Sequence, residues 1–230
     1  MTKKIDKLYD ENLVVKPWGY EYVVYRNKNK LSVTLLNINY KKKTSLHCHP
    51  NKKSGFIMIK GKALFQLGLW KKRSEIKAAP SKRMIARGLF HQIESLSKEG
   101  IIALEFETPV DKKDLVRFQD DYGRQQKSYE GAKYTKKINS KFLKFKIPPS
   151  EKKITYSIYG VKLLIENHKN FKKINKCKND TIFAILDGEI VDNNNKAVLS
   201  CGDIVKTNDL KVLSKVFKIK KLLTLLKVTK

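Results

Sequence analysis

Residues 56–64 read FIMIKGKAL, an apolar run that stops at a glycine and then resumes. This pattern predicts a buried β-strand, a tight turn at Gly61 and a returning strand. Runs rich in β-branched and aromatic residues at 21–25, 31–38 and 101–106 predict further short strands. Because long amphipathic helical periodicity is nearly absent, the sequence predicts an all-β fold, either a sandwich or a small barrel.

A second stretch, FAILDGEIV at residues 183–191, aligns without gaps on the first and places Gly188 at the position of Gly61. This repeat predicts two β-barrels in one chain, although an unrelated second β domain is the alternative. A polar stretch at 125–133 and a later Pro-Pro pair indicate a linker between them. The expected organisation is a first domain at 1–124, a linker at 125–150 and a second β domain at 151–230.

Composition limits the class of protein. Hydrophobic residues make up 41% of the 230 residues, which is enough to bury a core, and no apolar run reaches the ~20 residues that a membrane helix needs. The first residues contain no hydrophobic segment of the kind that secretory signals have. Three cysteines, an odd number, favour a reducing compartment. These features predict a soluble cytoplasmic protein that does not bind membranes.

The net charge of +28, from 50 basic and 22 acidic residues, is the strongest compositional signal. Such an excess attracts nucleic acids, membrane surfaces or anionic small molecules. Residues 1–124 carry +13 and residues 125–230 carry +15, so neither half is the basic one. Only six of the basic residues are arginines, the type that base and phosphate recognition favours. The excess is therefore interpreted as a compositional habit of the chain rather than a binding patch. Its field would still favour a phosphorylated small molecule, the expected partner. A nucleic-acid-associated protein is the weaker alternative.

Three of the four histidines point to a metal site. His47 and His49 are two residues apart, so on a strand both side chains project from the same face. A closed barrel can bring His91, which follows Gly88 in the sequence, beside this pair. Imidazole nitrogens suit Zn, Fe, Mn, Ni or Cu, and three of them leave coordination positions open for a substrate. A solvated polar face is the alternative interpretation of the His-x-His pair.

Four segments around these histidines resemble one protein family: VKPWGYE at 15–21, TSLHCH at 44–49, IARGLFHQIE at 85–94 and DLVRFQDDYGR at 114–124. In this order they resemble the cupin superfamily and, within it, the cupin module of type II phosphomannose isomerases, which is often fused to mannose-1-phosphate guanylyltransferases. The resemblance implies a double-stranded β-helix (jelly-roll) barrel. It also implies a divalent metal, Zn before Fe, Mn or Ni, with the ligands His47, His49 and His91.

The sequence departs from that family at three positions. His47 stands where the family has Gln, which strengthens the site, and Ser54 stands where it has a Glu ligand. Loss of this carboxylate is expected to weaken metal affinity. Gln92 stands where the family has an Arg that suits phosphate or enediolate binding, which puts the isomerase chemistry in question. Candidates to replace this Arg are Lys60, Arg83 and Arg87.

The second copy lacks the site. Counting back from Gly188 puts Ile174 and Lys176 at the positions of His47 and His49, and this half contains His168 alone. No metal cluster is expected there. The second copy is therefore interpreted as a degenerate barrel that packs against the first or supports dimerisation, and a homodimer is a candidate assembly.

The resemblance implies a metal-dependent enzyme acting on a phosphorylated or nucleotide-activated sugar, in its most specific form a mannose 6-phosphate isomerase. Aldose–ketose isomerisation passes through an enediolate, whose charge a metal would stabilise while Glu94 or Glu105 carries the proton. The predicted substrate-binding residues are Lys60, Arg83, Arg87, Gln92, Arg117 and Arg124.

Several alternatives stay open at this point. Arg117 and Arg124 either clamp a phosphate or pair with neighbouring aspartates, and Trp18 and Tyr122 either stack on a sugar or anchor the barrel. The whole protein is alternatively a non-catalytic sugar- or metabolite-binding cupin or a cupin sugar epimerase, because fold and metal do not fix the reaction.

Overall fold

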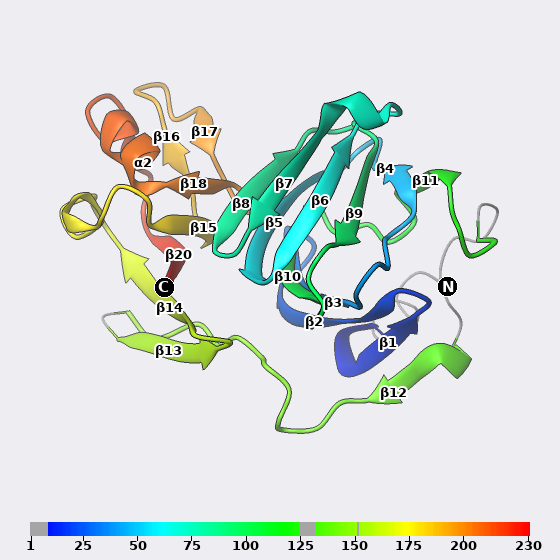
Figure 1. Cartoon of the computed structure of the whole chain (residues 1–230). Coiled ribbons are helices and arrows are strands. Elements are labelled where there is room, and N and C mark those ends of the chain that lie inside the picture. The colour runs from blue at the N-terminus through cyan, green and yellow to red at the C-terminus, as the bar shows by residue number, and fades with distance from the viewer. Residues whose placement is uncertain (1–8, 125–131, 151) are drawn as a thin grey trace. The chain divides into compact units, whose positions relative to one another are not determined.

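Short strands form most of the regular structure in the computed structural model, which describes residues 9–124, 132–150 and 152–230 (Figure 1). The chain divides into two compact units, one comprising residues up to 81 together with 85–145, the other comprising residues 82–84 and 146–230. None of the helices that the described residues form has the length and apolar character of a transmembrane helix.

The first unit is built from two largely antiparallel sheets. The larger sheet has the order β12 (Thr135–Lys137), β1 (Asn12–Lys16), β2 (Gly19–Asn27), β3 (Leu31–Ile38), β10 (Ile101–Thr108), β5 (Lys53–Lys60) and β8 (Ser81–Ile85). The smaller sheet has the order β11 (Val116–Gln119), β4 (Leu46–Cys48), β9 (His91–Ser95), β6 (Lys62–Leu67) and β7 (Ser74–Ala78). A 3-10 turn, η1 (Lys71–Arg73), joins β6 to β7.

Successive strands alternate between these sheets. After β3 the chain enters the smaller sheet as β4, returns to the larger as β5 and crosses again as β6, and β9, β10 and β11 repeat the alternation. An apolar core joins the sheets, with Phe56 and Met58 from β5 packing with Phe65 from β6 and Ile93 from β9. Strands that alternate between two packed sheets form a double-stranded β-helix. The prediction of an all-β jelly-roll fold is therefore confirmed.

The predicted strand, turn and returning strand around Gly61 are β5 and β6, which lie in different sheets, so the chain crosses from one sheet to the other at this turn. Gly61 has a φ of +80°, and a Cβ at this position would lie 2.8 Å from the Gly100 carbonyl oxygen. Glycine is the residue that adopts this left-handed conformation without a steric penalty. The strand before this turn, β5, matters for function because it pairs with β10, whose acidic residues line the candidate site.

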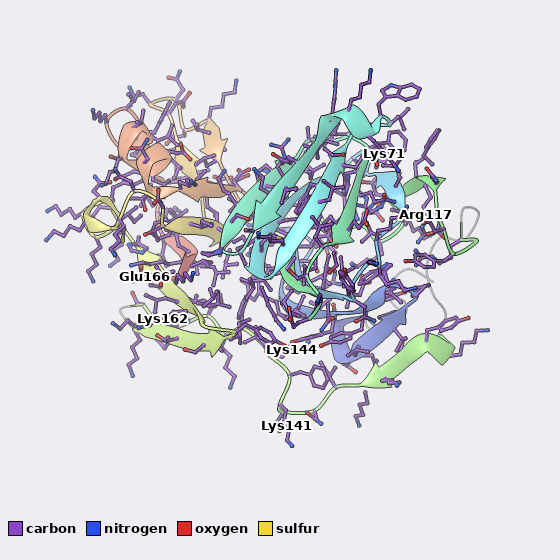
Figure 2. The ribbon with its side chains drawn as sticks, in the orientation of Figure 1. Lys71, Arg117, Lys141, Lys144, Lys162 and Glu166 are labelled. Carbon is purple, nitrogen blue, oxygen red and sulfur yellow. The ribbon has the colours of Figure 1, made fainter. Side chains whose placement is uncertain are left out.

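Part of the expected linker lies on the first unit. Strand β12, which follows the 3-10 turn η2 (Ala132–Tyr134), pairs antiparallel with β1. Farther along, the Phe145 backbone N–H donates to the Val24 carbonyl oxygen at 2.8 Å, and Lys144, labelled in Figure 2, donates to the Val23 carbonyl oxygen. The division into units accordingly falls after Phe145. Residues 125–131 of the expected linker lie outside the described residues.

The second unit contains a five-stranded and a three-stranded sheet. The larger has the order β13 (Lys153–Ile158), β14 (Val161–His168), β20 (Leu223–Thr229), β15 (Ile182–Asp187) and β18 (Ile204–Lys206). The smaller has the order β17 (Ala197–Leu199), β16 (Ile190–Val191) and β19 (Lys218–Ile219). One short helix, α2 (Thr207–Leu213), and a 3-10 turn, η3 (Ile174–Lys176), pack beside them.

The repeated sequence again forms a strand–glycine–strand unit. Gly188 lies between β15 and β16 with a φ of +89°, where a Cβ would collide with the Leu222 carbonyl group. Ile174 and Lys176, which align by count with His47 and His49, lie in η3 rather than on a strand. Common descent of the two units stays a prediction.

Candidate metal centre

Three histidines converge on the inner face of the smaller sheet. His47 on β4 is the direct cross-strand partner of His91 on β9, and His49 follows His47 on the same face. The ring centroids are 4.5 Å apart for His47 and His91, 5.0 Å for His47 and His49, and 5.5 Å for His49 and His91. One nitrogen of each ring lies within 4.8 Å of a nitrogen of both others. This cluster has the residue types and the spacing of a metal site.

Backbone carbonyl groups fix the tautomer of each ring. The Nδ1 atoms lie 2.8 Å from the Ser45 oxygen for His47, 2.5 Å from the Asp114 oxygen for His49 and 3.0 Å from the Leu89 oxygen for His91. Because a carbonyl oxygen can only accept, each Nδ1 donates, and each Nε2 keeps a lone pair in the neutral ring. This is the arrangement in which histidine binds metals through Nε2.

One of these Nε2 atoms has no hydrogen-bond partner in the part of the chain that the structure describes. His91 is buried, and its Nε2 has no hydrogen-bond partner among the described residues. A buried polar atom without a partner is uncommon and calls for an explanation. A divalent metal bound by Nε2 of His47, His49 and His91 would satisfy it, so the residues fit the metal that the fold implies.

Burial keeps these imidazoles neutral. It lowers the pKa of His47 well below the ordinary value, that of His49 to about 3 and that of His91 to about 4, and the nearby Lys52 ammonium contributes to all three. No proton therefore has to leave the rings before a metal binds at neutral pH.

The low pKa values predict a pH-dependent stability of the metal-free protein. Between pH 6.5 and about 4 these histidines are protonated in the unfolded chain but neutral in the folded protein. The free energy of unfolding therefore falls as the pH drops, by about 1.4 kcal/mol per pH unit for each histidine. Glu105, with a raised pKa, opposes this trend between pH 4.5 and 8. Urea melts of wild type and of His49→Asn give the change in the free energy of unfolding between pH 7.5 and pH 5. The histidine contribution is the difference between these two changes. A variant with an unchanged slope would contradict it.

Asp114 positions His49 and the turn after it. Its backbone oxygen accepts from His49, and its carboxylate accepts from the backbone N–H of Asn51 (3.1 Å) and of Lys52 (2.8 Å). Asp114 begins the last of the four family-like segments, yet sequence reasoning assigned it no role.

We expect Asp114→Asn to lower the free energy of unfolding by about 1–3 kcal/mol, because the amide removes an acceptor oxygen and strands a buried N–H. Metal affinity should fall with it, since the His49 orientation depends on the same turn. Chemical melts and metal titration of the same sample check both effects. An Asp111→Asn variant, changed at an exposed position, provides the control.

Two carboxylates face the histidines from the larger sheet. Glu105 and Glu107 are two residues apart on β10 and both line the cavity, and their carboxylate oxygens lie within 4.8 Å of each other and of a His49 nitrogen. Glu105 is one of the predicted catalytic residues. Glu107 was missed, although its spacing of two from Glu105 on a strand is the signal that would have found it.

The two carboxyl groups have opposite protonation. Burial, together with the neighbouring Glu107, raises the pKa of Glu105 to about 8. Burial acts on Glu107 too, but Lys112 and Lys52 outweigh it and hold the pKa of Glu107 well below its usual value. Near neutral pH the pair therefore comprises a protonated Glu105 beside an ionised Glu107.

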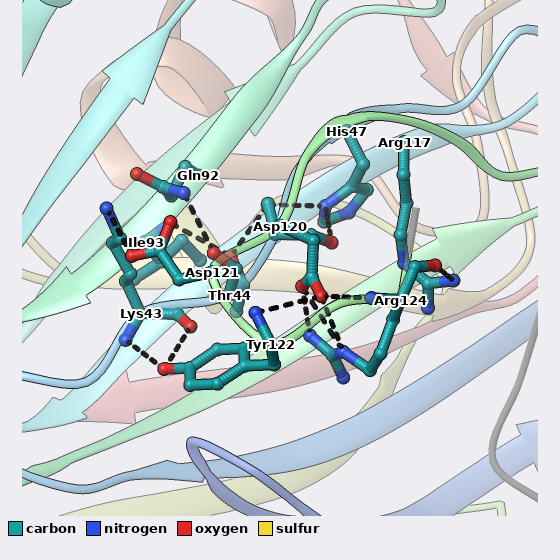
Figure 3. Close-up of polar contacts among 11 residues, drawn as sticks. Lys43, Thr44, His47, Gln92, Ile93, Arg117, Asp120, Asp121, Tyr122 and Arg124 are labelled. Atoms are coloured by element: carbon teal, nitrogen blue, oxygen red, sulfur yellow. Dashed lines mark hydrogen bonds and ion pairs between the residues drawn. The ribbon is translucent and has the colours of Figure 1, made fainter. Parts of the chain in front are cut away.

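Arg117 is the predicted substrate residue that stays available. It lines the cavity and is the cross-strand partner of His47. One of its NH groups donates to the Arg124 carbonyl oxygen at 3.3 Å, while its buried Nε has no hydrogen-bond partner among the described residues. Figure 3 shows its side chain next to that of Arg124.

Arg124 lines the same cavity, but its guanidinium group forms an ion pair with Asp120. Its Nε and a terminal nitrogen reach the Asp120 carboxylate at 3.2 and 2.6 Å, and its backbone N–H donates to the same group at 2.8 Å (Figure 3). Tyr122 exchanges hydrogen bonds with the backbone of Lys43, so it holds this closing segment in place. Trp18 is 4% exposed and belongs to the apolar core while also lining the cavity.

The structure does not bring the other predicted residues to the cavity that the described residues form. Gln92 donates to the Thr44 carbonyl oxygen at 2.9 Å, and Glu94 projects from the same face of β9, opposite to that of His91 and Ile93. Lys60 ends β5, Arg83 lies on β8 and Arg87 is exposed in the turn before β9. The site thus consists of three neutral imidazoles, the carboxyl groups of Glu21, Glu105 and Glu107, and cations from Lys16, Lys112, Arg117 and Arg124.

Comparisons with known proteins find similarity in solved structures alone. No protein-family model and no curated protein matches the chain. One similar solved structure is the capsular polysaccharide assembling protein CapF from Staphylococcus aureus, with a TM-score of 0.43 and 14% identity over 47% of this chain and 34% of that one. Others are KdgF from a Halomonas species (TM-score 0.38, 12% identity, 44% of this chain and 89% of that one) and a cupin-superfamily sugar phosphate isomerase from Silicibacter pomeroyi (TM-score 0.36, 11% identity, 40% of this chain and 59% of that one). The chain thus spans about a third of the length of CapF.

Proposed function

We propose that the first unit is a metal-dependent enzyme that isomerises a phosphorylated or nucleotide-activated sugar between its aldose and ketose forms, with mannose 6-phosphate as the substrate to test first. The observation that carries the proposal is the composition of one cavity. Three imidazoles with free lone pairs line it from one sheet, and the Glu105 carboxyl group faces them from the other.

His47, His49 and His91 would hold the metal. When bound, a divalent ion supplies a Lewis acid for the carbonyl and hydroxyl oxygens of the sugar. The backbone carbonyls of Ser45, Asp114 and Leu89 keep the three rings in the orientation and tautomer that this task needs.

Glu105 is the proposed proton carrier. In an aldose–ketose isomerisation a proton leaves C2 and a proton arrives at C1, while the C2 hydroxyl proton moves to the C1 oxygen. Among the described residues, the Glu105 carboxyl group makes no hydrogen bond or ion pair, so its oxygens are available to a sugar in the cavity. With its pKa raised to about 8, Glu105 is ionised in a minor fraction of molecules near neutral pH; this ionised form takes the C2 proton and then returns it to C1.

Arg117 is the proposed anion-binding residue. Its position beside His47 and its unpartnered Nε, judged among the described residues, suit a phosphate bound next to the metal site. Lys16 and Lys112 line the same cavity but are paired with Glu21 and Glu107, so Arg117 is the residue to which the phosphate is assigned.

Proton exchange followed by NMR tests the function directly. Metal-loaded protein is incubated with mannose 6-phosphate in deuterated water, and the sugar C2 proton is followed. Loss of this proton with formation of fructose 6-phosphate is the expected result. Exchange without a ketose would identify an epimerase-like reaction instead. Bound metal and bound sugar without any exchange would overturn the proposal in favour of a non-catalytic sugar-binding protein.

A further inference from the structure

A buried charge cluster borders the histidines on the side of the larger sheet. The Glu107 carboxylate accepts from Lys52 at 2.5 Å through one oxygen and from Lys112 at 2.9 Å through the other. The exposed fractions of these side chains are 4% for Glu107, 0% for Lys52 and 7% for Lys112. Removing three charges from water is costly, so such a cluster is weak as a stabilising device.

Glu107 retains the capacity to bind a metal. Each oxygen of a carboxylate has two lone pairs, and each oxygen of Glu107 uses one for a lysine. Its carboxylate lies within 4.8 Å of a His49 nitrogen, and His49 also belongs to the three-histidine cluster. Glu107 is therefore next to the metal centre without being part of the histidine set.

The metal centre needs an anion that the histidines do not provide. Three neutral imidazoles leave the full double charge of a metal uncompensated in a buried cavity, which is unfavourable. Of the two described carboxylates that line this cavity and pair with lysines, Glu21 and Glu107, Glu107 is the one within 4.8 Å of a His49 nitrogen. Opposite it on β5 lies Ser54, whose buried hydroxyl has no hydrogen-bond partner among the described residues.

We propose that Glu107 is the anionic ligand of the His47, His49 and His91 site, delivered from β10, and that Lys52 competes with the metal for this carboxylate. The inference rests on the metal centre of the proposed function. Without a metal, Lys52 and Lys112 neutralise Glu107 and hold it in place. With a metal, the Lys52 ammonium lies close to a second, stronger cation, and the affinity of the site is reduced accordingly.

Titration of the metal-stripped protein with Co²⁺, followed by calorimetry and visible absorption, tests this. We expect Glu107→Gln to weaken Co²⁺ binding about 10–100-fold. Lys52→Met is expected to strengthen it about tenfold or more, since a neighbouring cation is removed. The double variant Ser54→Glu/Glu107→Gln, which moves the carboxylate to the paired position on β5, is expected to recover most of the affinity. Glu189→Gln breaks an exposed Glu–Lys ion pair and serves as the matched control.

The outcomes separate this inference from the metal centre itself. If Glu107→Gln binds Co²⁺ like wild type while His91→Ala does not, the Glu107 assignment is overturned and the histidine site stands. If His91→Ala also binds like wild type, the proposed metal centre fails with it. If Glu107→Gln does not fold, the Co²⁺ affinity of Lys52→Met is compared with that of the double variant Lys52→Met/Glu107→Gln. Equal affinities of these two proteins would overturn the assignment.

Discussion

Replacing His91 by alanine will abolish stoichiometric metal binding. The side chain is 1% exposed, its ring centroid lies 4.5 Å from that of His47 and 5.5 Å from that of His49, and its removal leaves two imidazoles from a single short segment. The proposed ligand set then keeps two imidazoles and Glu107, a carboxylate that Lys52 and Lys112 also bind, which is too few and too weak a set to retain the metal. We expect the metal content after dialysis to fall from about one equivalent to a trace, and the isomerase activity to fall with it. Elemental analysis of the purified variant measures the first effect.

His168→Ala is the matched control for this experiment. His168 is a buried histidine of the second unit, paired with Glu166 at 3.2 Å, so its loss also removes a buried ring but leaves the three-histidine cluster intact. We expect unchanged metal content. Full metal occupancy in His91→Ala would show that the metal, if present, is held elsewhere.

Glu105→Gln will reduce turnover by about 10²–10⁴-fold and leave the metal content unchanged. Glutamine has nearly the same shape but cannot accept a proton, so the loss reports proton transfer rather than packing. The C2 proton exchange should slow by the same factor, because Glu105 is the unpaired carboxyl group that faces the cavity in the described residues. Initial rates and NMR exchange on the same sample provide both numbers.

Glu94→Gln, measured alongside, decides between the two carboxylates that the sequence names. Glu94 projects from the face of β9 opposite to His91, so the structure favours Glu105 as the proton carrier. A large loss of exchange in Glu94→Gln together with normal exchange in Glu105→Gln would reverse the assignment. Glu99→Gln, at an exposed turn position, controls for the change of charge.

The fold was predictable because its signals are local. The apolar run ending at Gly61 specifies a strand, a tight turn and a second strand through the conformation that only glycine adopts easily, and His47 and His49 share a face through strand alternation. The same alternation, applied to β9 and β10, separates Glu94 from His91 and joins Glu107 to Glu105. These two details were therefore within reach of the sequence.

Other features of the site depend on tertiary structure. In the sequence, Lys52 follows His49 and directly precedes β5. Its ion pair with Glu107 forms because β10 is paired with β5. Whether Arg117 or Arg124 is available to a ligand depends on the bidentate contact of Arg124 with Asp120. Sequence spacing specifies neither contact, since long charged side chains reach many partners.

The cross-strand pairing of His47 with His91 has a consequence for biosynthesis. The two residues belong to strands far apart in the chain, and four further strands are synthesised between them. During synthesis His47 and His49 therefore leave the ribosome well before His91. Folding of the barrel must then offset the entropic cost of closing the loop between β4 and β9. Metal loading is accordingly a late event, and early capture of an ion by the nascent chain is disfavoured.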